Sequence, residues 1–116
     1  MAAHCEVELD IFSGMPNPTW ALSADDSDGL MRQVAALPQT GARELAGNLG
    51  YRGFIVRCTD GASMRTVRVQ RGLVETENSK TVHARDEGRR LERWLLKTGE
   101  HHLSPEIFTV VERDLH

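Results

Sequence analysis

Cysteine is scarce in this chain of 116 residues, and its scarcity excludes one class of protein. The two cysteines, Cys5 and Cys58, lie far apart and form no closely spaced pair motif. Two cysteines cannot build the disulfide framework of a small secreted scaffold. They leave two interpretations, buried structural thiols or a single disulfide, and we expect the thiols.

The chain also lacks an apolar stretch of the roughly 18 residues that a membrane-spanning helix needs. Its first residues, "MAAHCEVELDIF", contain no basic segment followed by an apolar run, which is the pattern of a secretory signal. We therefore expect a cytoplasmic protein in a reducing setting, with no membrane partner.

Motifs that carry known chemistries are missing as well. No Gly-x-Ser-x-Gly or Cys/His signature occurs, and the glycines of "GNLGYRG" make neither a Walker nor a dinucleotide pattern. We therefore predict no catalytic residue and no cofactor. His4 and Cys5 are weak candidate ligands for copper or zinc, because thiol and imidazole both suit these ions. No Cys-x-x-Cys or His-x-x-x-His spacing supports them.

The net charge of −3 is unevenly distributed along the chain. Residues 1–30 contain six carboxylates and no Lys or Arg, whereas residues 31–97 contain thirteen basic against seven acidic residues. We expect the acidic and basic parts to neutralise each other in the fold. Five cations, Arg85, Arg89, Arg90, Arg93 and Lys97, gather in one predicted helix. A pI near 5.9 nevertheless predicts no nucleic-acid partner.

What is present predicts one α+β domain over residues 1–116. In "CEVELDIF" apolar and acidic residues alternate, which indicates a half-buried strand, and "TWALS" is a second short strand. The two β-branched runs of "FIVRCTDGASMRTVRV" flank a turn and predict a second hairpin. Residues 73–84 are predicted to form a polar loop with a short edge strand over 73–75. The expected fold is a mainly antiparallel sheet of about four strands, in two hairpins, covered on one face by two or three helices.

Capping residues mark the predicted helices. Ser23, Asp25 and Ser27 are the candidate N-caps of a first helix that Pro38 stops, and Asp86 and Gly99 bound a second helix. The Ser104–Pro105 pair starts a third helix, although the β-branched run that follows leaves a strand open as an alternative. "GARELAGNLG" predicts a further short helix.

The stretch "SGMPNPTWAL" is the most unusual feature of the chain. Its two prolines fix their own φ angles and restrict the residues before them, and Gly14 permits a sharp bend. The segment is thus either a turn that blocks edge pairing or a preorganised recognition loop. In the second interpretation the partner-binding residues are Ser13, Met15, Pro16, Asn17, Pro18 and Trp20, with Arg52 as a further exposed candidate. Core packing is the alternative role for Trp20.

A second hypothesis uses the acidic face of the first strand. Glu6, Glu8 and Asp10 could form a site together with Arg57 or Arg68, which would make the protein a small enzyme or a ligand-binding accessory protein. The same arginines could instead neutralise these carboxylates across the sheet. An antiparallel sheet with a free edge can also form a homodimer.

The element order resembles that of the emfourin-like proteins, which are small bacterial inhibitors of thermolysin-type metalloproteases. The resemblance covers most of residues 5–97 and lies in "IFSG", "WALS", "FIVRCTDGASMRTVRV" and "RRLERWLL". It implies an inhibitor-like bacterial protein. Together with the stiff loop, it favours a non-enzymatic binding module that presents residues 13–20 to a protein partner.

Overall fold

The computed structural model describes residues 3–12, 14–41 and 51–115. Its strands are β1 (His4–Leu9), β2 (Thr19–Ala21), β3 (Gln39–Thr40), β4 (Phe54–Asp60), β5 (Ser63–Gln70), β6 (Leu73–Glu77) and β7 (Thr81–Arg85). Its helices are α1 (Ala24–Ala36), the 3₁₀ turn η1 (Glu87–Arg89), α2 (Arg90–Thr98) and α3 (Pro105–Asp114). The predicted helix over 41–50 lies almost wholly outside the described residues.

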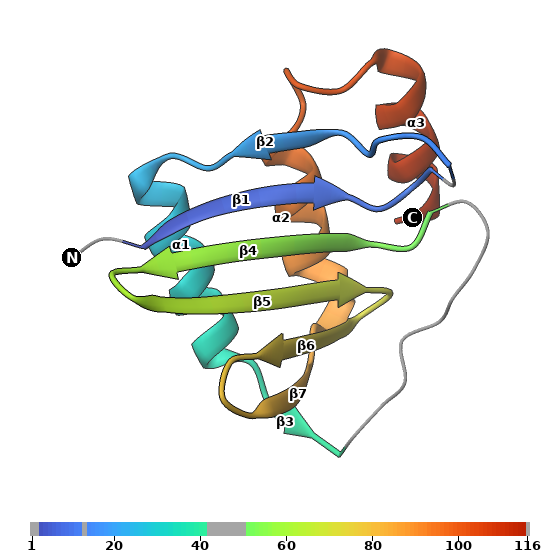
Figure 1. The fold of residues 1–116 in the computed structure, drawn as a ribbon. Coiled ribbons are helices and arrows are strands. Elements are labelled where there is room, and N and C mark those ends of the chain that lie inside the picture. The colour runs from blue at the N-terminus through green and yellow to red at the C-terminus, as the bar shows by residue number, and fades with distance from the viewer. Residues whose placement is uncertain (1–2, 13, 42–50, 116) are drawn as a thin grey trace.

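The strands form one antiparallel sheet in the order β2-β1-β4-β5-β6-β7-β3 (Figure 1). The α+β class is confirmed, but the prediction of about four strands is too small, because the described sheet has seven. The segment predicted as a polar loop forms β6 and β7, with Val74 paired to Ala84 on the helical side. Both strands carry polar residues on the opposite face. A long run of consecutive β-branched residues is therefore absent, and the two strands were not predicted.

The alternation of apolar and acidic residues predicts β1 correctly. Cys5, Val7 and Leu9 are buried, whereas Glu6 is exposed and Glu8 is partly exposed. The predicted hairpin of β4 and β5 is also found, with Val56 opposite Val67. Both α1 and α2 lie on the same side of this sheet, behind it in Figure 1, and they cover the apolar face of its middle strands β1, β4 and β5.

The helices begin and end where the capping residues predict, with one shift. Ser23 Oγ accepts a hydrogen bond from Asp26 N at 3.0 Å, and Ser104 Oγ accepts one from Ile107 N at 3.3 Å. The alternative of a strand after Pro105 is therefore wrong. Buried Asp86 caps α2 from a distance, because η1 intervenes and its carboxylate accepts from the amides of Leu91 and Glu92 at 2.9 and 3.1 Å.

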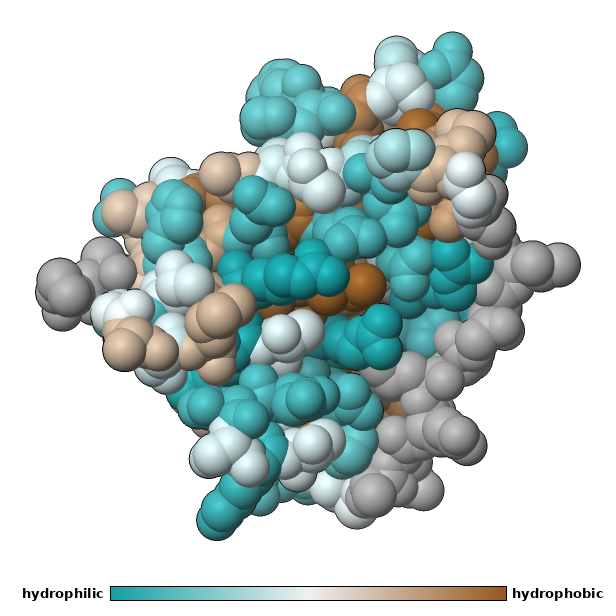
Figure 2. Space-filling model, in the orientation of Figure 1, coloured by the Kyte–Doolittle hydropathy of each residue, from teal (hydrophilic) through white to brown (hydrophobic). Residues whose placement is uncertain are grey.

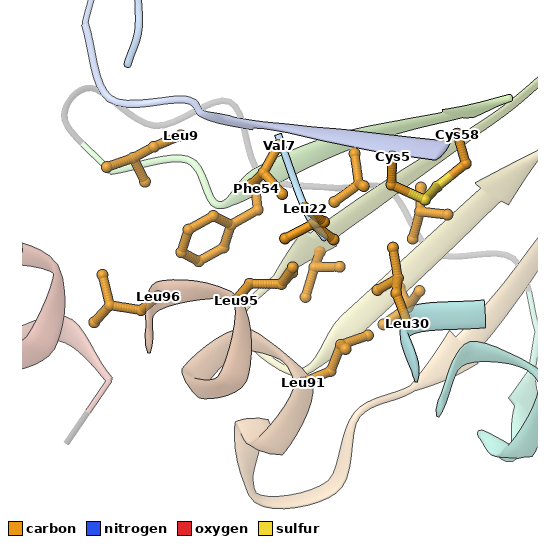
Figure 3. Close-up of a cluster of buried hydrophobic side chains, with 14 of the residues drawn as sticks. Cys5, Val7, Leu9, Leu22, Leu30, Phe54, Cys58, Leu91, Leu95 and Leu96 are labelled. Carbon is orange, nitrogen blue, oxygen red and sulfur yellow. A yellow bond between two sulfur atoms is a disulfide. The ribbon is translucent and has the colours of Figure 1, made fainter. Parts of the chain in front are cut away.

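One core lies between the sheet and the helices (Figure 3). Leu95 of α2 lies beneath Val7 and Phe54 of the central strands, and Leu30 of α1 lies beneath Cys5 and Cys58 with Leu91 of α2 nearby. Trp20 packs against the end of α2, where a Cβ on Gly99 would lie 2.5 Å from its ring. This close approach requires glycine at the end of α2, a role additional to ending the helix.

Cys5 and Cys58 form a disulfide within this core (Figure 3). They lie directly opposite each other on β1 and β4, with their Cα atoms 4.1 Å apart, and both are buried. The expectation of free buried thiols is wrong, and the single disulfide is the alternative that the structure adopts. Disulfides persist mainly in oxidising compartments, so the argument from cysteine usage for a cytoplasmic setting no longer holds. Among the described helices, none is long and apolar enough to cross a bilayer.

Replacing both Cys5 and Cys58 by Ala is expected to lower the free energy of unfolding by about 2–4 kcal/mol, because the disulfide closes a long loop in the unfolded chain. Urea unfolding of the oxidised protein and of the double variant measures this difference. Titration of thiols in the denatured, unreduced protein is the direct check. Two reactive thiols there would contradict the disulfide.

Candidate functional site

The loop between β1 and β2 is the candidate site, and Asn17 organises it. The Oδ1 atom of Asn17 accepts hydrogen bonds from the amides of Ile11 and Phe12 at 3.1 and 2.8 Å. Its Nδ2 donates to Glu8 Oε2 at 2.8 Å and to Asp10 Oδ1 at 3.4 Å. One side chain thus ties the returning strand of the loop to the end of β1.

Arg52 supports the same loop from the other side. Its guanidinium donates to Asp10 Oδ1 through Nε at 3.1 Å and Nη2 at 2.9 Å, and Nη2 also donates to the carbonyl of Phe12 at 2.8 Å. The hydrogen bond to Asp10 raises the pKa of Arg52. The expectation of an exposed Arg52 is wrong: its side chain is partly buried and is engaged in the loop base.

The tip of the loop is free of such contacts to the core. Gly14 adopts φ 76°, so the predicted sharp bend is confirmed. Met15 follows it and keeps 59% of its surface exposed, and Pro16 is exposed beside it. Pro18 is partly buried, and its carbonyl accepts from the amide of Leu9 at 3.0 Å. Ser13 lies outside the described residues.

Trp20 does not belong to the exposed part of the site. It retains 4% of its surface, and its Nε1 donates to Thr98 Oγ1 at 3.0 Å. The ring also meets Phe54 edge-on, with centroids 6.4 Å apart. Core packing, the alternative role for Trp20, is what the structure shows, and contact of Trp20 with a partner stays a prediction.

Two of the three carboxylates on the acidic strand face, Glu8 and Asp10, form ion pairs. Arg57 Nη1 donates to Glu8 Oε1 at 2.8 Å, and Asp10 is bound by Arg52. Hydrogen bonds from Asn17 first, and then from Arg57, hold the pKa of Glu8 below its usual range. Figure 2 shows this side of the sheet as a mainly hydrophilic surface. The cross-strand neutralisation that was one expectation for these residues is thus found at Glu8.

The thiol that the metal-binding hypothesis requires is not available to a metal ion, because Cys5 forms a disulfide. Cys5 is bonded to Cys58, and His4, next to it, is exposed. Within residues 3–12, 14–41 and 51–115, no three His, Cys, Asp or Glu side chains are grouped closely enough to hold a metal ion.

A buried polar cluster around Glu92 was missed by sequence reasoning. Glu92 has no exposed surface, and its carboxylate accepts from Tyr51 Oη, from the amide of Gly72 at 3.2 Å and from Arg89 Nε and Nη2 at 3.0 and 2.8 Å. Arg89 also donates to the carbonyl of Asp114 at 2.8 Å. Burial first, and then the charge of Glu92, raises the pKa of Tyr51. We assign this enclosed cluster a structural role.

The signal for the cluster was hidden in the helix pattern. The sequence pattern groups Arg89 with four other cations in one continuous helix, but η1 changes the phase of the helix before α2 begins. Arg89 itself has φ 57°, which turns its side chain back towards Glu92. No helical periodicity predicts a left-handed residue at that point.

Scans against protein-family models, curated proteins and solved structures found no match to this chain. The fold and the site are therefore interpreted from their own geometry.

Replacing Glu92 by Ala is expected to lower the free energy of unfolding by about 3–5 kcal/mol, because Arg89 and Tyr51 then lose the group that compensates their burial. The measurement is chemical denaturation. Glu100→Ala, at an exposed position just beyond α2, is the control and is expected to change stability by less than about 0.5 kcal/mol. Equal effects of the two changes would refute the role given to Glu92.

Stability is expected to depend on the charge of Glu8. Because its pKa in the folded protein lies below the ordinary value of 4.5, its contribution is fully present above that pH and is lost as the pH falls through the folded pKa. Glu8→Gln is expected to be about 1 kcal/mol less stable at neutral pH, and the difference shrinks at acidic pH. Glu6→Gln, on the same face of β1, is the matched control. A difference that does not change with pH would contradict this assignment.

Proposed function

We propose that the protein is a non-enzymatic binding module that presents the braced loop, residues 14–19, to a protein partner. The observation that carries this proposal is the contrast between the fixed base of the loop and its exposed tip. Its base is fixed by Asn17 and Arg52, whereas Met15 at its tip is 59% exposed. A loop that is already ordered loses little conformational entropy on binding.

The chemistry of the tip favours a hydrophobic contact. Met15 is unbranched and polarisable, so its side chain adapts to irregular apolar surfaces. Pro16 adds a second exposed apolar group with no backbone N–H. Met15 and Pro16 together place adjacent apolar groups on a support that Asn17 and Arg52 fix at its base. We infer that the partner offers an apolar depression that accepts Met15.

The resemblance to emfourin-like proteins supports a protease as the partner class. A braced loop can enter an active-site cleft without first being ordered, which is an advantage for an inhibitor. The discriminating assay is inhibition of a thermolysin-type metalloprotease. A partner of another class would leave the binding-module proposal standing and remove only its inhibitor branch.

Met15→Asp is expected to weaken partner binding at least about tenfold, since it places a charge in an apolar contact. The immobilised wild-type protein is used to capture proteins from a native extract of the source cells, and the affinity of each captured protein is then measured for each variant. Asn17→Ala keeps Met15 but removes the brace, and it is expected to weaken binding through loss of preorganisation.

Met64→Asp is the matched control. Met64 is 64% exposed and lies on β5 near the opposite end of the sheet, by the β4–β5 turn (Figure 1). Its replacement is expected to leave binding unchanged. The proposal fails if no protein binds the wild type, or if Met15→Asp and Met64→Asp bind the same proteins with equal affinity.

A further inference from the structure

A cleft separates the C-terminal half of α1 from the β6–β7 hairpin. It has a volume of about 310 Å³, and its apolar walls are Val34 and Leu37 from the end of α1 and Val82 and Ala84 from β7. Ligand pockets in proteins begin at about this size. None of the loop residues 14–19 lines this cleft, so it is separate from the proposed partner-binding loop.

The cleft exists because the helical layer ends before the sheet does. α1 stops at Ala36, and after Pro38 the chain enters β3 at the edge of the sheet. Val82 lies opposite Thr76, on the face of the sheet that the helices cover elsewhere, yet it is 37% exposed. At this end of the sheet, an apolar side chain on the core side is thus open to solvent.

The charged residues of the cleft all have one sign. Arg65 and Lys80 line it, together with uncharged polar groups such as Thr76 and Ser79, and no Asp or Glu is among its lining residues. Arg65 Nη1 contacts Met31 Sδ at 3.5 Å. Among the described residues neither cation forms an ion pair, although Asp60 lines the neighbouring cavity that Arg65 also borders.

We propose that this cleft binds a small amphipathic carboxylate, with its apolar tail against Val34, Leu37 and Val82 and its head group near Arg65 and Lys80. Apolar walls with a few convergent polar groups are the usual composition of a ligand site. The two unpaired cations select an anion, and the apolar walls select a ligand with a hydrocarbon part. Since a water molecule occupies about 30 Å³ of liquid, the cleft has room for on the order of ten non-hydrogen atoms.

Octanoate has about that many atoms and is the probe for the test. Calorimetric titration of the oxidised wild-type protein with octanoate is expected to give saturable binding in the millimolar to micromolar range. Octylammonium and acetate are the comparison ligands. Octylammonium keeps the hydrocarbon chain but carries a positive charge, and acetate keeps the carboxylate but lacks the chain. Both are expected to bind at least about tenfold more weakly.

The variants separate charge recognition from folding. Arg65→Gln and Lys80→Gln are each expected to weaken octanoate binding about threefold to tenfold. Lys80 is on an exposed turn, so its replacement tests the proposal even if Arg65→Gln impairs folding. Arg68→Gln is the control on the same strand, since Arg68 is exposed and lies on the other face of β5, and it is expected to bind octanoate normally.

Three results would overturn the proposal. Octanoate could give no saturable heat, octylammonium could bind as tightly as octanoate, or Lys80→Gln and Arg65→Gln could both bind like the wild type. Met15→Asp is expected to bind octanoate unchanged, so the outcome here does not depend on the role of the loop.

Discussion

The fold depends on satisfying the buried carboxylate of Glu92, which binds donors from three separate parts of the chain. A carboxylate with no exposed surface is tolerated only when donors surround it. Here they come from separate parts of the chain: Tyr51 before β4, the amide of Gly72 after β5, and Arg89 before α2. Arg89 in turn binds Asp114 at the end of α3. Satisfying one charge therefore fixes where α2 lies on the sheet and where α3 ends.

The braced loop follows the same physical logic at the surface. Asn17 uses both its carbonyl and its amino group, and Arg52 uses its guanidinium, to satisfy backbone and carboxylate groups at the end of β1. The stiffness that the two prolines predict is thus reinforced by tertiary hydrogen bonds. The proposed ligand cleft lies near the other end of the strands, at the β6–β7 turn. Residues 14–19 do not line the cleft, so the two proposed surfaces are separate.

Local patterns predicted those elements whose cause is local. The alternation of Cys5, Val7 and Leu9 predicted β1, and the hydroxyls of Ser23 and Ser104 predicted where α1 and α3 begin. β6 and β7 were not predicted because few of their residues face the helices and most residues on their other face are polar. Within the candidate site, the bend at Gly14 and the exposure of Met15 were predictable. The bracing roles of Asn17 and Arg52 were not, because their partners are chosen by the pairing of β1 with β2 and β4.

By itself, the sequence determined the α+β class, the start of α3, where α1 and α2 end, the two hairpins and the position of the proline loop, since each follows from the periodicity or backbone chemistry of a few adjacent residues. Only the tertiary structure decided that Cys5 faces Cys58, that Trp20 is buried against Gly99, and that Glu92 is enclosed. These outcomes depend on strand register and on the phase of α2 after η1. Both are set by how distant segments share one core and satisfy each other's buried polar groups, which no local pattern specifies.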